Sequence, residues 1–418
     1  MPRGFLHDMP PALIAKAVVG TALSRFWGVV MTISKPVFDR LGLMLWIVAF
    51  LVTASLAQMA LDHRSVVFVY RNGSEAFMAQ QPLYHVHLAM GYLYAPAFAA
   101  LYSPLLMLGH NFGDLVWRTI CFGVITLAVV RQVRKLGGHD LTWLLSFGLV
   151  ISLPMALGAI RNGQATILLT GACWLLTLSA LEGRRAETFL WTSLAIIAKP
   201  TAIVMVLLIA ALRPRLIPVI VLALLVVLII PYAFAPVGYV NDQYRDFFQM
   251  LTAMAVDRTG PFEPADFTSI FASFGYPIPE REATIVRVIA ALMALSAVLW
   301  YDRKVERGTA GLAIFVVAAF YMCVFNPRVE PNTYAMIAIP AGVAIAFLWR
   351  EEQAGALGVA LVTLLVLSGM TGIFRPVHEF FSPWLRPIIA SLISCALIWW
   401  FWARAREKVH DTGPVAHG

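Results

Sequence analysis

The sequence has few charged residues. Only 13% of its 418 residues are Asp, Glu, Lys or Arg, whereas 60% are hydrophobic. A soluble domain carries about a quarter charged residues, because its surface faces water. The scarcity of charge therefore excludes an ordinary soluble protein and predicts that most of the chain faces lipid. The net charge of +8 does not indicate a nucleic-acid partner, because the basic residues stand in short clusters between apolar runs, as in loops that flank membrane spans.

Cysteine is also scarce, and its placement excludes most cysteine chemistry. The four cysteines, Cys121, Cys173, Cys323 and Cys395, all fall inside apolar runs, without a CxxC pair or a spacing typical of metal ligands. We expect them to be small buried side chains, and we predict neither a metal site nor a cofactor. No internal repeat of 20–50 residues and no low-complexity tract is visible.

Long apolar runs dominate what is present. Runs long enough to cross a bilayer occur at 41–61, 113–132, 140–158, 165–182, 214–235, 283–301, 308–325, 332–349, 355–373 and 385–403. Two shorter runs, 187–198 and 200–212, meet at Lys199-Pro200. The pattern predicts an all-α integral membrane protein, a bundle of about 12 transmembrane helices over 41–404. Residues 1–40 are predicted to form a cytoplasmic amphipathic segment rather than a cleaved signal, and residues 405–418 a cytoplasmic tail.

Basic clusters predict the orientation, because cytoplasmic loops carry an excess of Lys and Arg. The clusters are Arg131 with Arg134 and Lys135, Arg184 with Arg185, Arg213 with Arg215, Arg303 with Lys304 and Arg307, Arg350, and the tail residues Arg404, Arg406 and Lys408. If all face the cytoplasm, both termini are cytoplasmic. A first outer loop then covers 62–112 and a large outer loop covers 236–282.

This topology constrains two segments. Residues 94–109 cannot form a full span, so we expect a helix on the outer membrane surface, broken by Pro96 and Pro104. The segment 187–212 has basic flanks on both sides, so the chain must enter and leave on the same face. Two short helices meeting at Lys199-Pro200 satisfy this requirement. A single helix kinked at Pro200 is the alternative, and it would place the two flanks on opposite faces.

The same topology leaves many cations outside, and positive-inside placement alone would discourage this. They are Arg64, Arg71, Arg118, Arg161, Lys199, Arg245, Arg258, Arg281, Arg287, Arg328, Arg375 and Arg386. We expect some of them to neutralise an anion. Lys199 and Arg328 are the first candidates, because each lies at the end of a span beside a proline. The alternative is that both extend to lipid head groups.

Short motifs in order along the chain resemble a known family. They comprise Val69-Tyr70, Gly73-x-Glu75-Ala76, Pro82-Leu83-Tyr84, Tyr94-x-Pro96 and Pro104-Leu105, then Asn162-Gly163-Gln164, Ala198-Lys199-Pro200, Asn326-Pro327 and Asn332-x-Tyr334. Together they resemble the GT-C glycosyltransferases, and most closely glycosyltransferase family 87, which includes mannosyltransferases that use polyprenol-phosphate-mannose. The resemblance extends from about residue 62 to residue 340.

The resemblance implies a function and a set of site residues. The donor would be a sugar on a polyprenyl phosphate, and the acceptor a lipid or a cell-envelope glycan, on the outer face of a bacterial cytoplasmic membrane. An acid in the first outer loop would act as base, with inversion at the anomeric carbon, and cations would stabilise the leaving phosphate. The implied donor- and substrate-binding residues are Arg64, Tyr70, Arg71, Arg161, Asn162, Gln164, Lys199, Arg328, Asn332 and Tyr334.

The sequence departs from the family at the expected base. The family's Asp lies four residues before the position of Tyr70, and Val66 occupies that position here. Asp62 is the nearest carboxylate and the candidate base, although it could instead be a solvated helix end paired with Arg64. Glu75 is the second candidate. Further outer carboxylates that could substitute are Asp242, Asp246, Asp257, Glu263, Asp266 and Glu330.

Two other functions stay open at the level of the sequence. A GT-C-fold protein without catalysis could bind a lipid-linked glycan, and Val66 in place of Asp favours this alternative. A transporter or flippase of lipid-linked sugars would also use broken helices such as the one at Lys199-Pro200. Against a transporter, the sequence shows no twofold repeat of hydropathy and no charged residue deep in a span.

Overall fold

The computed structural model describes residues 41–59, 65–84, 91–138, 140–256, 264–327, 329–352, 355–370 and 380–411. Within these ranges every regular element is helical and no strand occurs. The all-α class predicted from the hydropathy pattern is thus confirmed. The predicted amphipathic segment 1–40 lies outside the described residues.

Eight segments of the described chain are long and apolar enough to cross a bilayer. They are Leu41–Met59, α4 (His110–Leu136), α5 (Leu141–Arg161), Pro214–Ala233, α12 (Glu280–Lys304), Arg307–Phe325, Pro331–Glu351 and Leu385–Glu407. The segment Pro214–Ala233 contains α9 (Ile217–Ile229), and Arg307–Phe325 consists of α13 (Arg307–Phe320) and the π-helical turn η4 (Tyr321–Phe325). The segment Pro331–Glu351 consists of η5 (Pro331–Tyr334) and α14 (Ala335–Glu351), and Leu385–Glu407 is most of α17 (Leu385–Asp411).

The other helices are shorter or more polar. They are α2 (Val67–Met78), α3 (Pro96–Leu106), α6 (Ala165–Leu181), α7 (Arg185–Ala198), the 3₁₀ turn η1 (Pro200–Ala202), α8 (Ile203–Leu212), α10 (Val237–Val256), α11 (Phe267–Ser273) and α15 (Ala356–Met370). The predicted number of about 12 spans is not confirmed. In particular α6 and α15, both predicted as spans, are each slightly short of a full crossing.

The bundle has a buried centre and a lipid-facing periphery. In the segment Pro331–Glu351 94% of the most apolar window is buried, whereas in α12 only 17% is. The exposed side chains of α12 include Ile289, Leu292 and Met293. Large exposed apolar surface on a helix of this length indicates contact with lipid. The buried centre consists of α6, α13 and α14, and α12 lies at the periphery.

Small residues let the central helices approach closely. The helices α5 and α14 pack along each other. A Cβ atom on Gly148 of α5 would lie 3.1 Å from Cα of Val343 and 3.2 Å from the carbonyl oxygen of Gly342, both on α14. Such contacts are the usual means of helix association in membranes, where van der Waals packing replaces the hydrophobic effect.

The segment 187–212 forms the predicted pair of short helices. Lys199 ends α7 in an extended conformation (φ −159°, ψ 139°), and Pro200 begins the turn η1 that leads into α8. Arg184, just before α7, binds Glu182 at the end of α6, and Arg213, just after α8, binds Asp302 near the end of α12. Arg131 of α4 binds Glu182, and the neighbouring Gln132 donates to the carbonyl oxygen of Gly308, at the start of α13 just after α12, at 2.9 Å. Both flanks therefore lie at the same end of the bundle, and the single kinked helix is excluded.

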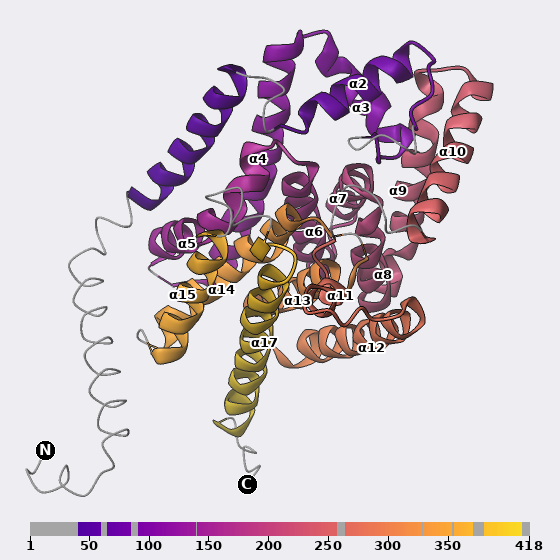
Figure 1. Cartoon of the computed structure of the whole chain (residues 1–418). Helices are drawn as coiled ribbons and strands as arrows, with labels where there is room; N and C mark the ends of the chain where they lie inside the picture. Colours follow the sequence, from indigo (N-terminus) through magenta and orange to yellow (C-terminus); the bar gives the residue numbers. More distant parts are fainter. Residues whose placement is uncertain are drawn as a thin grey trace, which may run out of the picture.

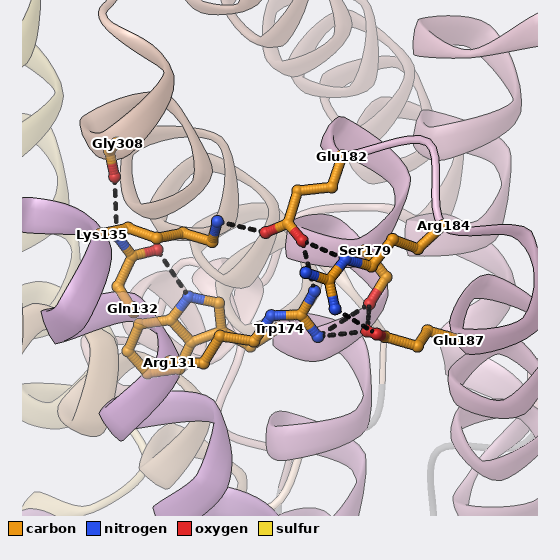
Figure 2. Close-up of polar contacts among 9 residues, drawn as sticks. All are labelled: Arg131, Gln132, Lys135, Trp174, Ser179, Glu182, Arg184, Glu187 and Gly308. Carbon is orange, nitrogen blue, oxygen red and sulfur yellow. Dashed lines mark hydrogen bonds and ion pairs between the residues drawn. The ribbon is translucent and has the colours of Figure 1, made fainter.

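That end, which we call the basic end, carries a network of ion pairs (Figure 2). Arg131 of α4 donates to Glu182 (2.7 Å) and to Glu187 of α7, and Lys135 also binds Glu182. Arg184 donates to both glutamates, and the Ser179 hydroxyl donates to Glu187 at 2.8 Å. The network ties α4, α6 and the start of α7 together, which positions the hairpin formed by α7 and α8.

The opposite end of the bundle is covered by α2 and α3, which lie against each other across the ends of the longer helices (Figure 1). We call it the α2–α3 end. A Cβ atom on Gly73 of α2 would overlap the ring of Tyr92, so glycine is required for this close approach. The predicted surface segment 94–109 contains α3, an apolar helix of 11 residues that is too short to span.

One expectation about the cysteines is wrong. Cys121, Cys173 and Cys323 are buried, but Cys395 is exposed. It lies on α17 beside residues such as Leu392 and Trp399, which are also exposed. An apolar run in a membrane protein predicts a membrane environment rather than burial within the protein, and here the side chain is on a lipid-facing surface.

Candidate functional site

The turn between α5 and α6 forms the base of the candidate site. Gly163 has a φ of +64°, in the left-handed region that favours glycine. A Cβ atom there would lie 2.5 Å from Cγ2 of Val67 and 3.0 Å from Cζ of Arg118. The turn therefore needs glycine both for its backbone conformation and for space. The structure thus explains why the central residue of the motif Asn162-Gly163-Gln164 is glycine.

Two side chains of α4 hold this turn. Arg118 donates to the carbonyl oxygen of Arg161 at 2.6 Å and to the Ser65 hydroxyl at 2.9 Å. Trp117 Nε1 donates to the carbonyl oxygen of Gly163 at 2.9 Å. Arg118, predicted as a possible anion-binding cation, thus satisfies carbonyl groups that the end of α5 leaves without helical partners.

Tyr70 joins α2 to the start of α6. Its hydroxyl accepts the backbone N–H of Ala165 at 2.9 Å and shares a hydrogen bond of 3.1 Å with the Tyr94 hydroxyl. Its ring contacts Phe98 and Trp117 edge-on, with centroids 5.0 and 5.4 Å away. Burial raises the pKa of both Tyr70 and Tyr94 well above the ordinary value, so both hydroxyls stay protonated.

Gln164 precedes α6 and lies almost fully buried. Its Nε2 donates to Oε2 of Glu330 at 3.2 Å. Its Oε1 has no hydrogen-bond partner among the described residues. The carboxylate of Glu330 also lies within electrostatic range of the Tyr70 and Tyr94 hydroxyls. Glu330 is therefore hydrogen-bonded to the motif residue Gln164 and lies near the motif residue Tyr70.

The loop that carries Glu330 is anchored on both sides. Before it, the carbonyl oxygen of Val329 accepts the N–H of Ala265 at 2.7 Å. After it, a Cβ atom on Gly158 of α5 would lie 2.6 Å from Oδ1 of Asn332, so the Asn332 side chain packs directly on the helix. Tyr334 is fully buried and donates to the carbonyl oxygen of Ala265 at 2.6 Å.

Lys199 lies at the point where α7 breaks. The residue is partly exposed, and its backbone bonds to Ala195 and Ala202, but no hydrogen bond or ion pair links its ammonium group to any residue in the described ranges. Its ammonium group lies within electrostatic range of the Cys323 thiol on η4. A partly buried cation without a carboxylate partner retains its capacity to bind an anion.

Four other predicted site residues lie on α2 and at the end of α5. Arg71 is buried, and its Nη1 lies 3.2 Å from Oδ2 of Asp114 on α4. Glu75 is half-exposed and lies 3.1 Å from Nε2 of His110. Asn162 accepts the N–H of Val66 through its backbone carbonyl at 3.0 Å. Arg161 is partly buried beside it. Arg71 and Glu75 point to different partners on α4.

The remaining predicted site residues, Asp62, Arg64 and Arg328, lie outside the described residues. Two residues near the site received no specific role from the sequence. Asp114 was not singled out, although a buried acid at the start of a span is unusual. Glu330 was only one of several outer acids, and its proximity to Gln164 depends on a contact across 166 residues of sequence. Among the described residues, no cluster of His, Cys, Asp or Glu could hold a metal ion.

A large apolar groove lies between α12, α13 with η4, and α17. Its volume is about 560 Å³. Its lining includes Trp300 and Trp399 toward the basic end, and Tyr321 and Phe325 of η4 toward the α2–α3 end. Phe325, which ends η4, lies five residues before Glu330 in the sequence.

One comparison with known proteins gives a match. The model of glycosyltransferase family 87 matches residues 92–327, which is more than half of the chain. No curated protein and no solved structure matches the chain. The matched region includes Gln164 and Lys199, whereas α2 and the Glu330 loop lie outside it.

Proposed function

Because the chain belongs to glycosyltransferase family 87, and is therefore a membrane glycosyltransferase, we propose that it transfers mannose or a similar hexose or pentose from a polyprenyl phosphate to a lipid or cell-envelope glycan. The observation that carries the proposal is Lys199. Its side chain is a cation without a partner among the described residues, at the break between the short helices α7 and α8. A leaving phosphate needs such a charge.

The apolar groove supports a lipid donor. An isoprenoid chain lying between α12 and α17 would be in contact with Trp300 and Trp399 and would remove their surface from the bilayer. From there its phosphate end would extend past Tyr321 of η4 toward Lys199, whose ammonium group lies within electrostatic range of Cys323 on the same turn. The groove and the cation are thus compatible with the two parts of one amphipathic molecule.

The proposed reaction is a single displacement. The acceptor oxygen attacks C1 of the sugar, the bond between C1 and the phosphate oxygen breaks, and the anomeric configuration inverts. The family's usual base position is Val66, which packs against the core in this chain. Asp62 stays a candidate base. Glu75 is a weaker candidate in the described structure, because it pairs with His110 at the surface.

The proposed orientation places the α2–α3 end outside a bacterial cytoplasmic membrane. The basic end carries Arg131, Lys135 and Arg184, as cytoplasmic loops do. Donor and acceptor would then meet at the outer leaflet. Attaching a cysteine-reactive, membrane-impermeant label to Gly109→Cys, at the start of α4, in intact cells tests this. Labelling only after the cells are opened would reverse the assignment.

Incubation of the purified full-length protein in lipid nanodiscs with radiolabelled polyprenyl-phosphate sugars and a lipid extract as acceptor tests the function. We expect label in a new glycolipid with at least one donor. Absence of both transfer and donor binding with mannose, glucose and pentose donors would reject the proposal.

A second candidate is a GT-C protein that binds a lipid-linked glycan without transferring it. The hydrophobic Val66 at the family's acid position favours it. The same nanodisc preparation separates the two candidates, because saturable binding of the donor without any turnover would support binding alone.

A further inference from the structure

The α2–α3 end contains several carboxylates, and most of them have basic partners. The pairs in the described chain are Glu75 with His110, Asp114 with Arg71, Asp242 with Arg245, Asp266 with Arg287, and Glu280 with Arg287. In each pair the carboxylate is already in contact with a basic side chain. A substrate hydroxyl would have to displace that side chain to reach the carboxylate.

Glu330 differs in its partner. Its carboxylate accepts from the neutral amide of Gln164 at 3.2 Å, and no basic side chain within the described ranges forms an ion pair with it. Asp246 on α10 and Glu282 on α12 also form no ion pair with a basic side chain in the described ranges. However, no hydrogen bond links either of them to the α5–α6 turn. Glu330 alone of these three contacts a family motif residue.

The position of Glu330 is well defined. Its own backbone carbonyl accepts the N–H of Thr333 at 2.8 Å, and the next carbonyl, of Pro331, accepts Nη1 of Arg386 at 2.8 Å. The side chain is partly exposed. A proton acceptor needs this combination of a fixed backbone and an accessible carboxylate.

The neighbouring hydroxyls do not compete for the proton. Tyr70 is fully buried and Tyr94 is partly buried in their aromatic cluster, and the two hydroxyls share a hydrogen bond while the Tyr70 oxygen also accepts the N–H of Ala165. A substrate hydroxyl that reached Glu330 would therefore meet one free proton acceptor beside the buried Gln164 amide, whose Oε1 has no partner within the described chain. That unpartnered oxygen is itself buried, so the accessible acceptor at this place is the Glu330 carboxylate.

We propose that Glu330 is the general base of the transfer reaction and that Gln164 positions it. This inference rests on the proposed function. The acceptor O–H gives its proton to the Glu330 carboxylate, the acceptor oxygen forms a bond to C1, and polyprenyl phosphate leaves with the electron pair of the C1–O bond. The acceptor therefore needs a hydroxyl that can reach the partly exposed carboxylate of Glu330.

Glu330→Gln tests the proposal, since it keeps the shape and the contact with Gln164 but cannot accept a proton. We expect kcat to fall about 10²- to 10⁴-fold, with the dissociation constant of the polyprenyl-phosphate donor unchanged within about twofold. The matched control Glu282→Gln changes an acid on α12 without a link to the turn, and we expect it to keep wild-type kcat.

A second variant distinguishes a base from a structural residue. In Glu330→Ala, added formate supplies a small carboxylate, and we expect it to restore kcat at least tenfold without changing donor binding. Wild-type kcat in Glu330→Gln would overturn the inference, and so would a lost activity that accompanies lost donor binding and does not respond to formate. Loss of activity in Asp62→Asn together with an active Glu330→Gln would assign the base to Asp62.

The outcome also separates the inference from the proposed function. An active wild-type protein with an active Glu330→Gln variant rejects Glu330 alone. A wild-type protein that transfers no sugar from any donor rejects the proposed function, and the inference falls with it.

Discussion

The two ends of the bundle use charge in opposite ways. At the basic end, Arg131 and Lys135 of α4 meet Glu182 and Glu187 in a network where each carboxylate has more than one cation (Figure 2). At the α2–α3 end, Gln164 and Glu330 form a contact between an amide and a carboxylate, and Lys199 has no ion pair within the described chain. Charges that are paired stabilise a structure, whereas charges that remain available can bind a substrate.

The difference extends to how the turns are held. At the α2–α3 end, the turn at Gly163 is packed against Val67 and Arg118. At the basic end, the turn at Gly183 has an almost equal φ of +71° but no atom within 4 Å of a would-be Cβ. The first end is therefore built by close packing around the site, and the second by ion pairs around an open turn.

The largest expected effect concerns Lys199. If its charge binds the leaving phosphate, Lys199→Met should lower kcat/KM about 10²- to 10³-fold, which corresponds to about 3–4 kcal/mol of transition-state stabilisation. The unfolding temperature of the Lys199→Met variant should not fall, because the substitution removes no ion pair to a described residue. The matched control is Lys304→Met at the end of α12, which should leave kcat/KM unchanged. Equal losses in both variants would contradict a specific role of Lys199.

The two turn glycines give the next effect. Gly163→Ala should destabilise the protein by about 2–4 kcal/mol, because it adds a steric clash to the cost of a left-handed backbone. Gly183→Ala carries only the backbone cost, about 1–2 kcal/mol. Chemical unfolding in a mild detergent measures both values. If the two variants lost equal stability, the close packing around Gly163 would not contribute.

A substitution at the basic end should lower stability and leave catalysis unchanged, which is the opposite of the effect expected for Lys199→Met. Arg131→Met breaks contacts to Glu182 and Glu187, which are partly buried, and should lower the free energy of unfolding by about 2 kcal/mol. The kcat per folded molecule should stay at the wild-type value. Arg303→Met, an exposed arginine on α12, is the control and should change neither quantity. If kcat fell in Arg131→Met under conditions where all of the protein is folded, the ion pairs at the basic end would contribute to catalysis at the α2–α3 end.

Local sequence patterns predicted the elements better than the contacts between them. Apolar runs and basic flanks were enough for the α7–α8 hairpin, because both depend only on which residues can face lipid and which must face water. The predicted spans at α6 and α15 are not confirmed, because these helices have only 17 and 15 residues. A buried helix such as α6 need not match the thickness of the bilayer. It also failed to distinguish a lipid-facing Cys395 from a buried one, because lipid and protein core select the same side chains.

The candidate site shows the same limit. Short motifs indicated Tyr70, Gln164 and Lys199 individually, and the structure brings Tyr70 and Gln164 into the same hydrogen-bonded region. No local pattern could select Glu330, because its proximity to Gln164 follows from the packing of α5 against α14 and η5. Asp62 and Arg328 stay predictions, since they lie outside the described residues.

The smallest expected effect is the pH dependence of the basic end. Partial burial disfavours a charge on Glu187, but hydrogen bonds from Arg184, Arg131 and Ser179 outweigh it and lower its pKa from 4.5 to about 2. A lowered folded-state pKa means that the stabilisation is complete above about pH 4.5 and is lost as the pH falls toward 2. Wild-type protein should therefore lose its advantage in unfolding temperature over Glu187→Gln between these values. Because the variant cannot ionise at this position, a difference that stayed constant from pH 7 to pH 3 would mean that the charge of Glu187 does not stabilise the basic end.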